Sequence, residues 1–246
     1  LRALHDIPLM LVSFVRELIG FDDTSDENRF VDFLHAGALV GFQEASGSLA
    51  RWRRGMTFTA IGTRAELSEK ISSFADAAGI RSLLRKCRIG LLSCYNDAMW
   101  STYIDPYNVF MKIGPELSFL SLADLESETA DITDEEADET VNKLSEHFRV
   151  LENVDPVKFR ESVRVTLAME RMAHGDRADI LCLNDCDGAL FRHLGLRPGF
   201  APTDPADDVV YVPEGDLGGA LSTWILGLAS GGKANFIEPF YIDRER

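Results

Sequence analysis

Two acidic residues follow an apolar segment near the end of the chain, in the stretch VYVPEGDLGGAL. The β-branched and aromatic residues before Pro213 predict a buried strand, and the small residues after Asp216 predict a helix. Glu214 would then lie at the carboxyl end of a strand, where open parallel sheets bind ligands. Glu238 lies 24 residues further on, in the next expected strand. One strand–helix–strand unit could bring Glu214 and Glu238 to the same rim, where two carboxylates could hold a hard divalent cation and transfer protons.

The elements needed to position these acids alternate along the chain. Apolar segments of strand length are separated by segments with helical spacing, and the strands are continuously apolar rather than alternating. This pattern predicts an α/β fold, with a doubly wound, Rossmann-like parallel sheet covered on both faces. The expected strands are Ile7–Val15, Thr57–Gly62, Arg88–Cys94, Glu116–Ser121, Ala178–Asn184, Asp208–Pro213 and Ala234–Ile242.

The alternation also predicts a domain organisation. Residues 1–86 are expected to form part of an N-terminal α/β lobe, and residues 87–232 a central doubly wound domain. Residues 233–246 are expected to be a strand that leads into a C-terminal domain lying beyond this sequence. Helix starts are predicted by capping boxes at Thr63 with Glu66 and at Thr133 with Glu136. The acidic stretch LESETADITDEEADE is expected to be a solvated turn followed by a helix start.

The composition restricts the classes of function. The 246 residues are 46% hydrophobic with a formal net charge of −15, which argues against binding to nucleic acid or to anionic membranes. The sequence has no apolar run of 18 residues and no signal peptide pattern. Its four cysteines form no metal-binding pattern, so reduced thiols and a cytoplasmic location are expected. A dinucleotide-binding GxGxxG motif does not follow any expected strand.

The stretch VPEGDLGGALSTWILGLASGGKANFIEPFYID resembles the metal-site segment of the L-fucose isomerase and L-arabinose isomerase superfamily. The resemblance implies a Mn²⁺ site, or a site for another divalent cation, that catalyses aldose–ketose isomerisation of a sugar through an ene-diol. It implies that Glu238 is a metal ligand in both branches and that Glu214 is one in the fucose branch, with both acids catalytic. Asp216 would order the loop or cap the following helix. A homo-oligomer, trimeric or hexameric, is implied as well.

The sequence departs from the superfamily in two places. The family completes its site with a histidine from a third domain, which would follow Arg246, and none of the five histidines here matches a family ligand. Without that domain the metal site would be weak or empty. The segment Asp185-Cys186-Asp187 also differs from the family pattern, so the sugar is not identified. Two alternatives therefore stay open, a sugar-binding module and a catalytically inactive isomerase relative.

Overall fold

The computed structural model describes residues 7–14, 30–31, 38–52, 57–194, 202–237 and 242–243. Over these residues the protein is an α/β fold with parallel sheets, which confirms the predicted fold class. Contacts divide the chain into two compact units, Leu1–Gly79 and Ile80–Arg246. The division falls inside helix α3 (Arg64–Leu84), whereas the sequence predicts a boundary after residue 86.

The first unit contains two parallel strands, β1 (Leu9–Phe14) and β2 (Thr57–Gly62). Helix α2 (Ala38–Trp52) contacts both strands. Helix α3 follows β2 directly and begins with the predicted capping box. The Thr63 amide donates to Glu66 Oε2 at 2.8 Å, and the Glu66 amide donates to Thr63 Oγ1 at 3.4 Å.

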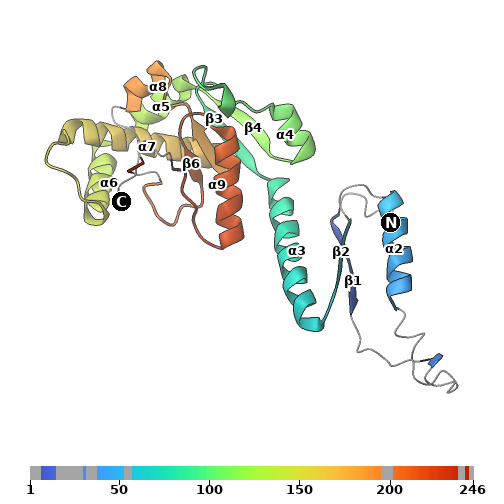
Figure 1. Ribbon diagram of the computed structural model, residues 1–246. Helices are drawn as coiled ribbons and strands as arrows, with labels where there is room; N and C mark the ends of the chain where they lie inside the picture. The colour runs from blue at the N-terminus through green and yellow to red at the C-terminus, as the bar shows by residue number, and fades with distance from the viewer. Residues whose placement is uncertain are drawn as a thin grey trace. The chain divides into compact units, whose positions relative to one another are not determined.

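The second unit is built around a four-stranded parallel sheet with the strand order β4-β3-β5-β6 (Figure 1). The chain passes from β3 to β4 on one side and then returns to place β5 on the other side of β3. The elements in order are β3 (Arg88–Leu92), η2 (Trp100–Thr102), α4 (Pro106–Lys112), β4 (Glu116–Leu120), α5 (Leu122–Asp131), α6 (Asp134–His147), α7 (Pro156–Asp176), β5 (Ile180–Leu183), α8 (Gly188–Leu194), β6 (Val210–Val212) and α9 (Leu217–Ser230).

Neighbouring residues of each central strand enter different cores, which makes the sheet doubly wound. Leu92 and Leu181 pack in a cluster with residues of α5, α7 and α8. Leu91 and Cys182 pack in a second cluster with residues of α4 and α9. Side chains alternate between the faces of a strand, so two cores on opposite faces require the continuously apolar strands that the sequence shows.

Side-chain caps are present at three further helix starts. Thr133 and Glu136 form the predicted capping box of α6. Asp155 accepts hydrogen bonds from the amides of Val157 and Lys158 at the start of α7. The Asp216 side chain accepts from the Gly219 amide at 2.8 Å, so Asp216 caps α9, as predicted.

Two expectations about individual elements are wrong. Most of the acidic stretch is helical, because α5 runs to Asp131 and buries Leu125 completely among the residues of the first core. The described residues 234–237 do not form a strand. Phe236 packs instead against the core that contains α9, while residues 238–241 lie outside the described part of the chain.

The described helices include none that is long and apolar enough to cross a lipid bilayer.

Candidate functional site

The loops that follow β3, β5 and β6 meet at the carboxyl edge of the four-stranded sheet. Because β4 and β5 lie on opposite sides of β3, the boundary between β3 and β5 is the point where the strand order reverses. Ligands bind at such a point in open α/β sheets. We refer to the residues of these three loops, 93–96, 184–187 and 213–216, as the carboxyl rim.

Glu214 occupies the centre of the carboxyl rim in an unusual backbone conformation. Its φ angle is 63°, in the left-handed region, and only 7% of the residue is exposed. The Glu214 amide donates to Asp185 Oδ1 at 2.8 Å, and its carbonyl accepts from Asn96 Nδ2 at 2.9 Å. A left-handed residue other than glycine costs about 1–2 kcal/mol and persists only where its surroundings hold it. The β3 and β5 loops therefore fix the position of this acid.

Gly215 continues the left-handed turn and brings the rim loops close together. Its φ angle is 66°, and its amide donates to the carbonyl of Leu183 at 2.9 Å. A Cβ atom at Gly215 would lie 3.5 Å from both Asn184 Cβ and the Asn96 amide nitrogen. The left-handed turn thus explains why a glycine follows Glu214 at the end of the strand, since glycine adopts the left-handed region without steric cost.

A second contact joins the β3 loop to the β5 loop. The Ser93 hydroxyl donates to the Asp187 carboxylate, and Ser93 also has a left-handed φ of 79°. This bond, together with the Ala189 amide, holds the pKa of Asp187 below its usual value. Asp187 is therefore an ionised acid whose oxygens accept hydrogen bonds from Ser93 in the loop after β3 and from the Ala189 amide at the start of α8.

Asn184 leaves one acceptor of the carboxyl rim unused. Its Nδ2 donates to the carbonyl of Tyr95 at 3.2 Å, which fixes the orientation of the amide. Its Oδ1 is buried and has no hydrogen-bond partner among the described residues. A buried acceptor without a partner is uncommon in folded proteins because it loses its hydration without compensation. A hydroxyl group or a water molecule is the chemistry that would satisfy it.

The structure tests only part of the predicted metal site. Glu214 lies at the carboxyl rim as predicted, but Glu238 lies outside the described residues, so their predicted convergence stays a prediction. Among the described residues, no group of three His, Cys, Asp or Glu side chains could hold a metal ion. All four cysteines are free, and burial raises the pKa of Cys87 to about 12, which keeps that thiol protonated.

Sequence reasoning missed two of the residues that shape the carboxyl rim, Ser93 and Asn96. Asn96 reaches Glu214 across 118 residues of sequence. Asn96 lies just after the expected strand Arg88–Cys94 and Ser93 lies within it, and no spacing rule joins these residues to the loop that holds Glu214. Comparison with known proteins adds no family. No protein-family model matches the sequence, and no curated protein matches it.

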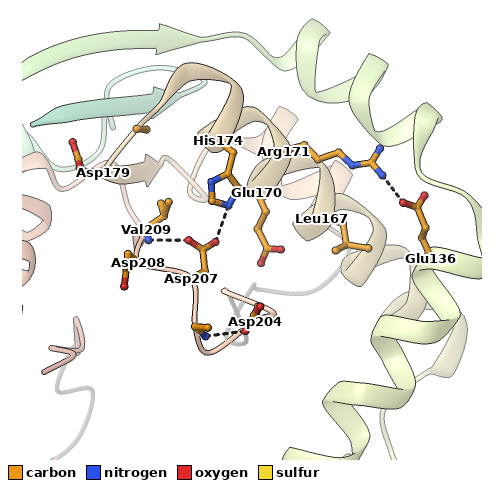
Figure 2. A pocket seen from close by; sticks show the side chains of 12 residues that line it. Glu136, Leu167, Glu170, Arg171, His174, Asp179, Asp204, Asp207, Asp208 and Val209 are labelled. Atoms are coloured by element: carbon orange, nitrogen blue, oxygen red, sulfur yellow. Dashed lines mark hydrogen bonds and ion pairs between the residues drawn. The ribbon is translucent and has the colours of Figure 1, made fainter.

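A separate cavity of about 670 Å³ lies at the amino ends of the strands, opposite the carboxyl rim (Figure 2). Its wall includes Asp179, which precedes β5, and the segment Asp204–Val209, which precedes β6. Acids from α6 and α7 complete it, and Figure 2 shows His174 and Asp207 pointing toward each other, with Nε2 and Oδ2 3.1 Å apart. We call this the amino-edge cavity.

Three acids of the amino-edge cavity, Glu136, Glu170 and Asp207, are occupied by bonds within the protein. The amide and hydroxyl of Thr203 donate to the two carboxylate oxygens of Glu170 at 2.6 and 2.7 Å. Asp207 Oδ1 accepts from the Val209 amide at 3.0 Å, and Glu136 pairs with Arg171. Burial raises the pKa of Glu170 above its usual value, although its bonds to Thr203 lower it. These bonds tie the segment before β6 to α7.

Proposed function

We propose that this chain carries part of the active site of a metal-dependent aldose–ketose isomerase, located at the carboxyl rim. The observation that carries the proposal is Glu214, a buried acid held in a left-handed turn at the carboxyl end of β6. Backbone strain at a ligand-binding edge is typical of functional sites. The resemblance of the surrounding stretch to the L-fucose and L-arabinose isomerases supplies the reaction class.

The donor chemistry of the carboxyl rim fits a hard divalent cation such as Mn²⁺ or Mg²⁺, which prefers oxygen ligands. Glu214 and Glu238 are the two residues of this chain that would hold it. When bound, such a cation would polarise the oxygens on carbons 1 and 2 of the sugar.

The residues of the chain have two tasks in this proposal. A carboxylate moves a proton between two neighbouring carbons of the substrate, as a general acid–base. Asp185 and Asn96 bond the backbone amide and carbonyl of Glu214, so that the turn which carries its carboxylate keeps its conformation during that transfer. The unpaired Oδ1 of Asn184 offers an acceptor for a sugar hydroxyl.

The test is formation of ketose from L-fucose, L-arabinose and D-arabinose, with and without Mn²⁺. In a protein that carries the expected C-terminal domain, at least one of these sugars should be converted only in the presence of metal, and Glu238→Gln should abolish conversion while leaving the fold intact. Glu214→Gln should also abolish conversion if the fucose-type geometry applies. With the arabinose-type geometry, the Glu214→Gln protein should keep more of its activity.

Two results would contradict the proposal. Full activity of the Glu238→Gln protein would remove this acid from the reaction. Sugar binding without any conversion, at every metal concentration, would favour the sugar-binding module instead.

A further inference from the structure

A group of large apolar side chains lies exposed around α4 and the edge strand β4. Trp100 is 82% exposed and Tyr107 is 71% exposed. We call the group the aromatic face. Its members, all at least 42% exposed, are Trp100, Tyr103, Tyr107, Phe110, Met111, Ile113 and Phe119. Single exposed apolar residues are ordinary, but a gathered set marks an interaction surface.

Helix geometry and ring contacts join Tyr103, Tyr107, Phe110, Met111 and Phe119 into one surface. Tyr107, Phe110 and Met111 lie at positions i, i+3 and i+4 of α4, so they form one stripe on that helix. Helix α4 contacts β4. The ring of Tyr95 lies 5.2 Å from that of Tyr103 and 6.2 Å from that of Phe119, which connects the loop after β3 to the strand.

The aromatic face is poor in charge in a strongly acidic protein. Only three of the 21 residues from Trp100 to Leu120 are charged, or about 14%, against 26% for the whole chain. Two copies with a net charge of −15 repel each other over most of their surfaces. Tryptophan, tyrosine, phenylalanine and methionine are also the residues enriched at protein interfaces. This face is therefore where a second copy can approach.

The open edge of β4 is suited to pairing with the same edge of a second copy. The Glu116 amide donates to the Cys87 carbonyl, and the Leu120 carbonyl accepts from the Ser93 amide. Bonding alternates along a parallel strand, so the amides and carbonyls of Leu117 and Phe119 point away from β3. Within the described residues β4 has no other neighbour. A two-fold axis near Ser118 would pair Leu117 of one copy with Phe119 of the other in antiparallel fashion.

The exposed area is sufficient for such a contact. At about 200 Å² for each aromatic side chain, the exposed parts of the five rings amount to roughly 600 Å² per copy. A stable interface needs about 800 Å² from each partner, and Met111, Ile113 and the strand edge supply the remainder.

We propose that the aromatic face binds a second copy of this chain, with the two β4 strands pairing antiparallel about Ser118. A two-fold contact gives a dimer or a larger even-numbered oligomer such as the expected hexamer, so sedimentation velocity on the 246-residue chain should give at least twice the 27.3 kDa mass at micromolar concentration. The double variant Tyr107→Asp, Phe110→Asp should weaken association at least tenfold. Val157→Asp, at a residue 69% exposed on α7, is the matched control and should leave the mass unchanged.

Hydrogen exchange separates this contact from any other mode of association. The Leu117 and Phe119 amides should be protected in the wild-type protein and exchange fast in the double variant, with the circular dichroism spectrum unchanged. A monomer at 100 μM wild-type protein would overturn the proposal. So would a dimer that persists in the double variant while these two amides exchange fast.

Discussion

The two edges of the four-stranded sheet differ in backbone conformation and in how fully their buried polar groups are bonded. At the amino edge, both oxygens of Glu170 accept bonds from Thr203, and Asp207 is satisfied by Val209 and His174. At the carboxyl rim, the backbone is left-handed at Ser93 and Glu214, and Asn184 Oδ1 has no partner among the described residues.

The difference shows that a count of acids does not locate a functional site. The amino-edge cavity holds more carboxylates, but Glu170 and Asp207 bond within the protein and hold the segment before β6 against α7. The carboxyl rim holds fewer acids, yet it concentrates strain and an unused acceptor at the edge where parallel sheets bind ligands. Arg177, the one other left-handed residue besides glycine in the described part of the chain, is the C-cap of α7, a common position for this conformation.

Removing the acid that holds Glu214 should produce the largest loss of stability. Asp185→Ala deletes the acceptor of the Glu214 amide at a site where Asp185 is only 3% exposed. Losing a buried hydrogen bond to a charged group costs about 1.5–3 kcal/mol. Urea denaturation should show a decrease of this size in the free energy of unfolding. Asp204→Ala, which removes an exposed bond to the Ala206 amide at the amino edge, should cost less than about 1 kcal/mol.

If the two variants lost equal stability, the contrast between the buried Asp185 bond of the carboxyl rim and the exposed Asp204 bond of the amino edge would fail.

Glycine substitutions should sharpen the same contrast. Gly215→Ala places a Cβ atom in the left-handed turn of the carboxyl rim and should cost about 1–2 kcal/mol. Gly175→Ala lies in α7 beside the amino edge, where a Cβ atom would meet no atom within 4 Å. It should stabilise the protein by about 0.5–1 kcal/mol. Thermal unfolding should therefore shift in opposite directions, and two shifts of the same sign would contradict the account of the turn.

The pH dependence of stability should come in part from Glu170. Its folded-state pKa is raised, mainly by burial, so the folded protein binds this proton more tightly than the unfolded chain. The resulting stabilisation is complete below the ordinary pKa of a glutamate and is lost as pH rises through the raised folded value. Glu170→Gln should therefore remove this part of the pH dependence of stability.

Glu136→Gln provides the control of opposite sign. Its hydrogen bond from the Thr133 amide lowers the pKa of Glu136, so its stabilisation is present above the ordinary pKa and lost as pH falls. Denaturation curves between pH 4 and 8 should show the wild type losing stability relative to Glu170→Gln as pH rises. Against Glu136→Gln, the wild type should gain stability over the same range.

The sequence predicted features that depend on nearby residues. The capping boxes and the Asp216 cap join residues three apart, and the continuously apolar strands predicted the parallel sheet with a core on each face. The helical course of α5 was missed because its acids outweighed the apolar residues Leu122 and Leu125. Residues 234–237 have the apolar content of a strand, and only the packing of Phe236 beside α9 distinguishes them from one. The contact of Asn96 with Glu214 depends on the order of the strands, which the local sequence does not encode.

The most direct test of the central claim is a measurement of Mn²⁺ binding. The electron paramagnetic resonance signal of the free ion reports how much Mn²⁺ stays unbound as its concentration is raised to millimolar. The claim is that the acid at the carboxyl rim, rather than the acids of the amino-edge cavity, serves a ligand. Glu214→Gln should weaken binding at least tenfold, or about 1.4 kcal/mol, relative to the wild-type chain. Asp207→Asn should leave binding unchanged. Equal binding by the wild type and Glu214→Gln, or a loss confined to Asp207→Asn, would contradict the account.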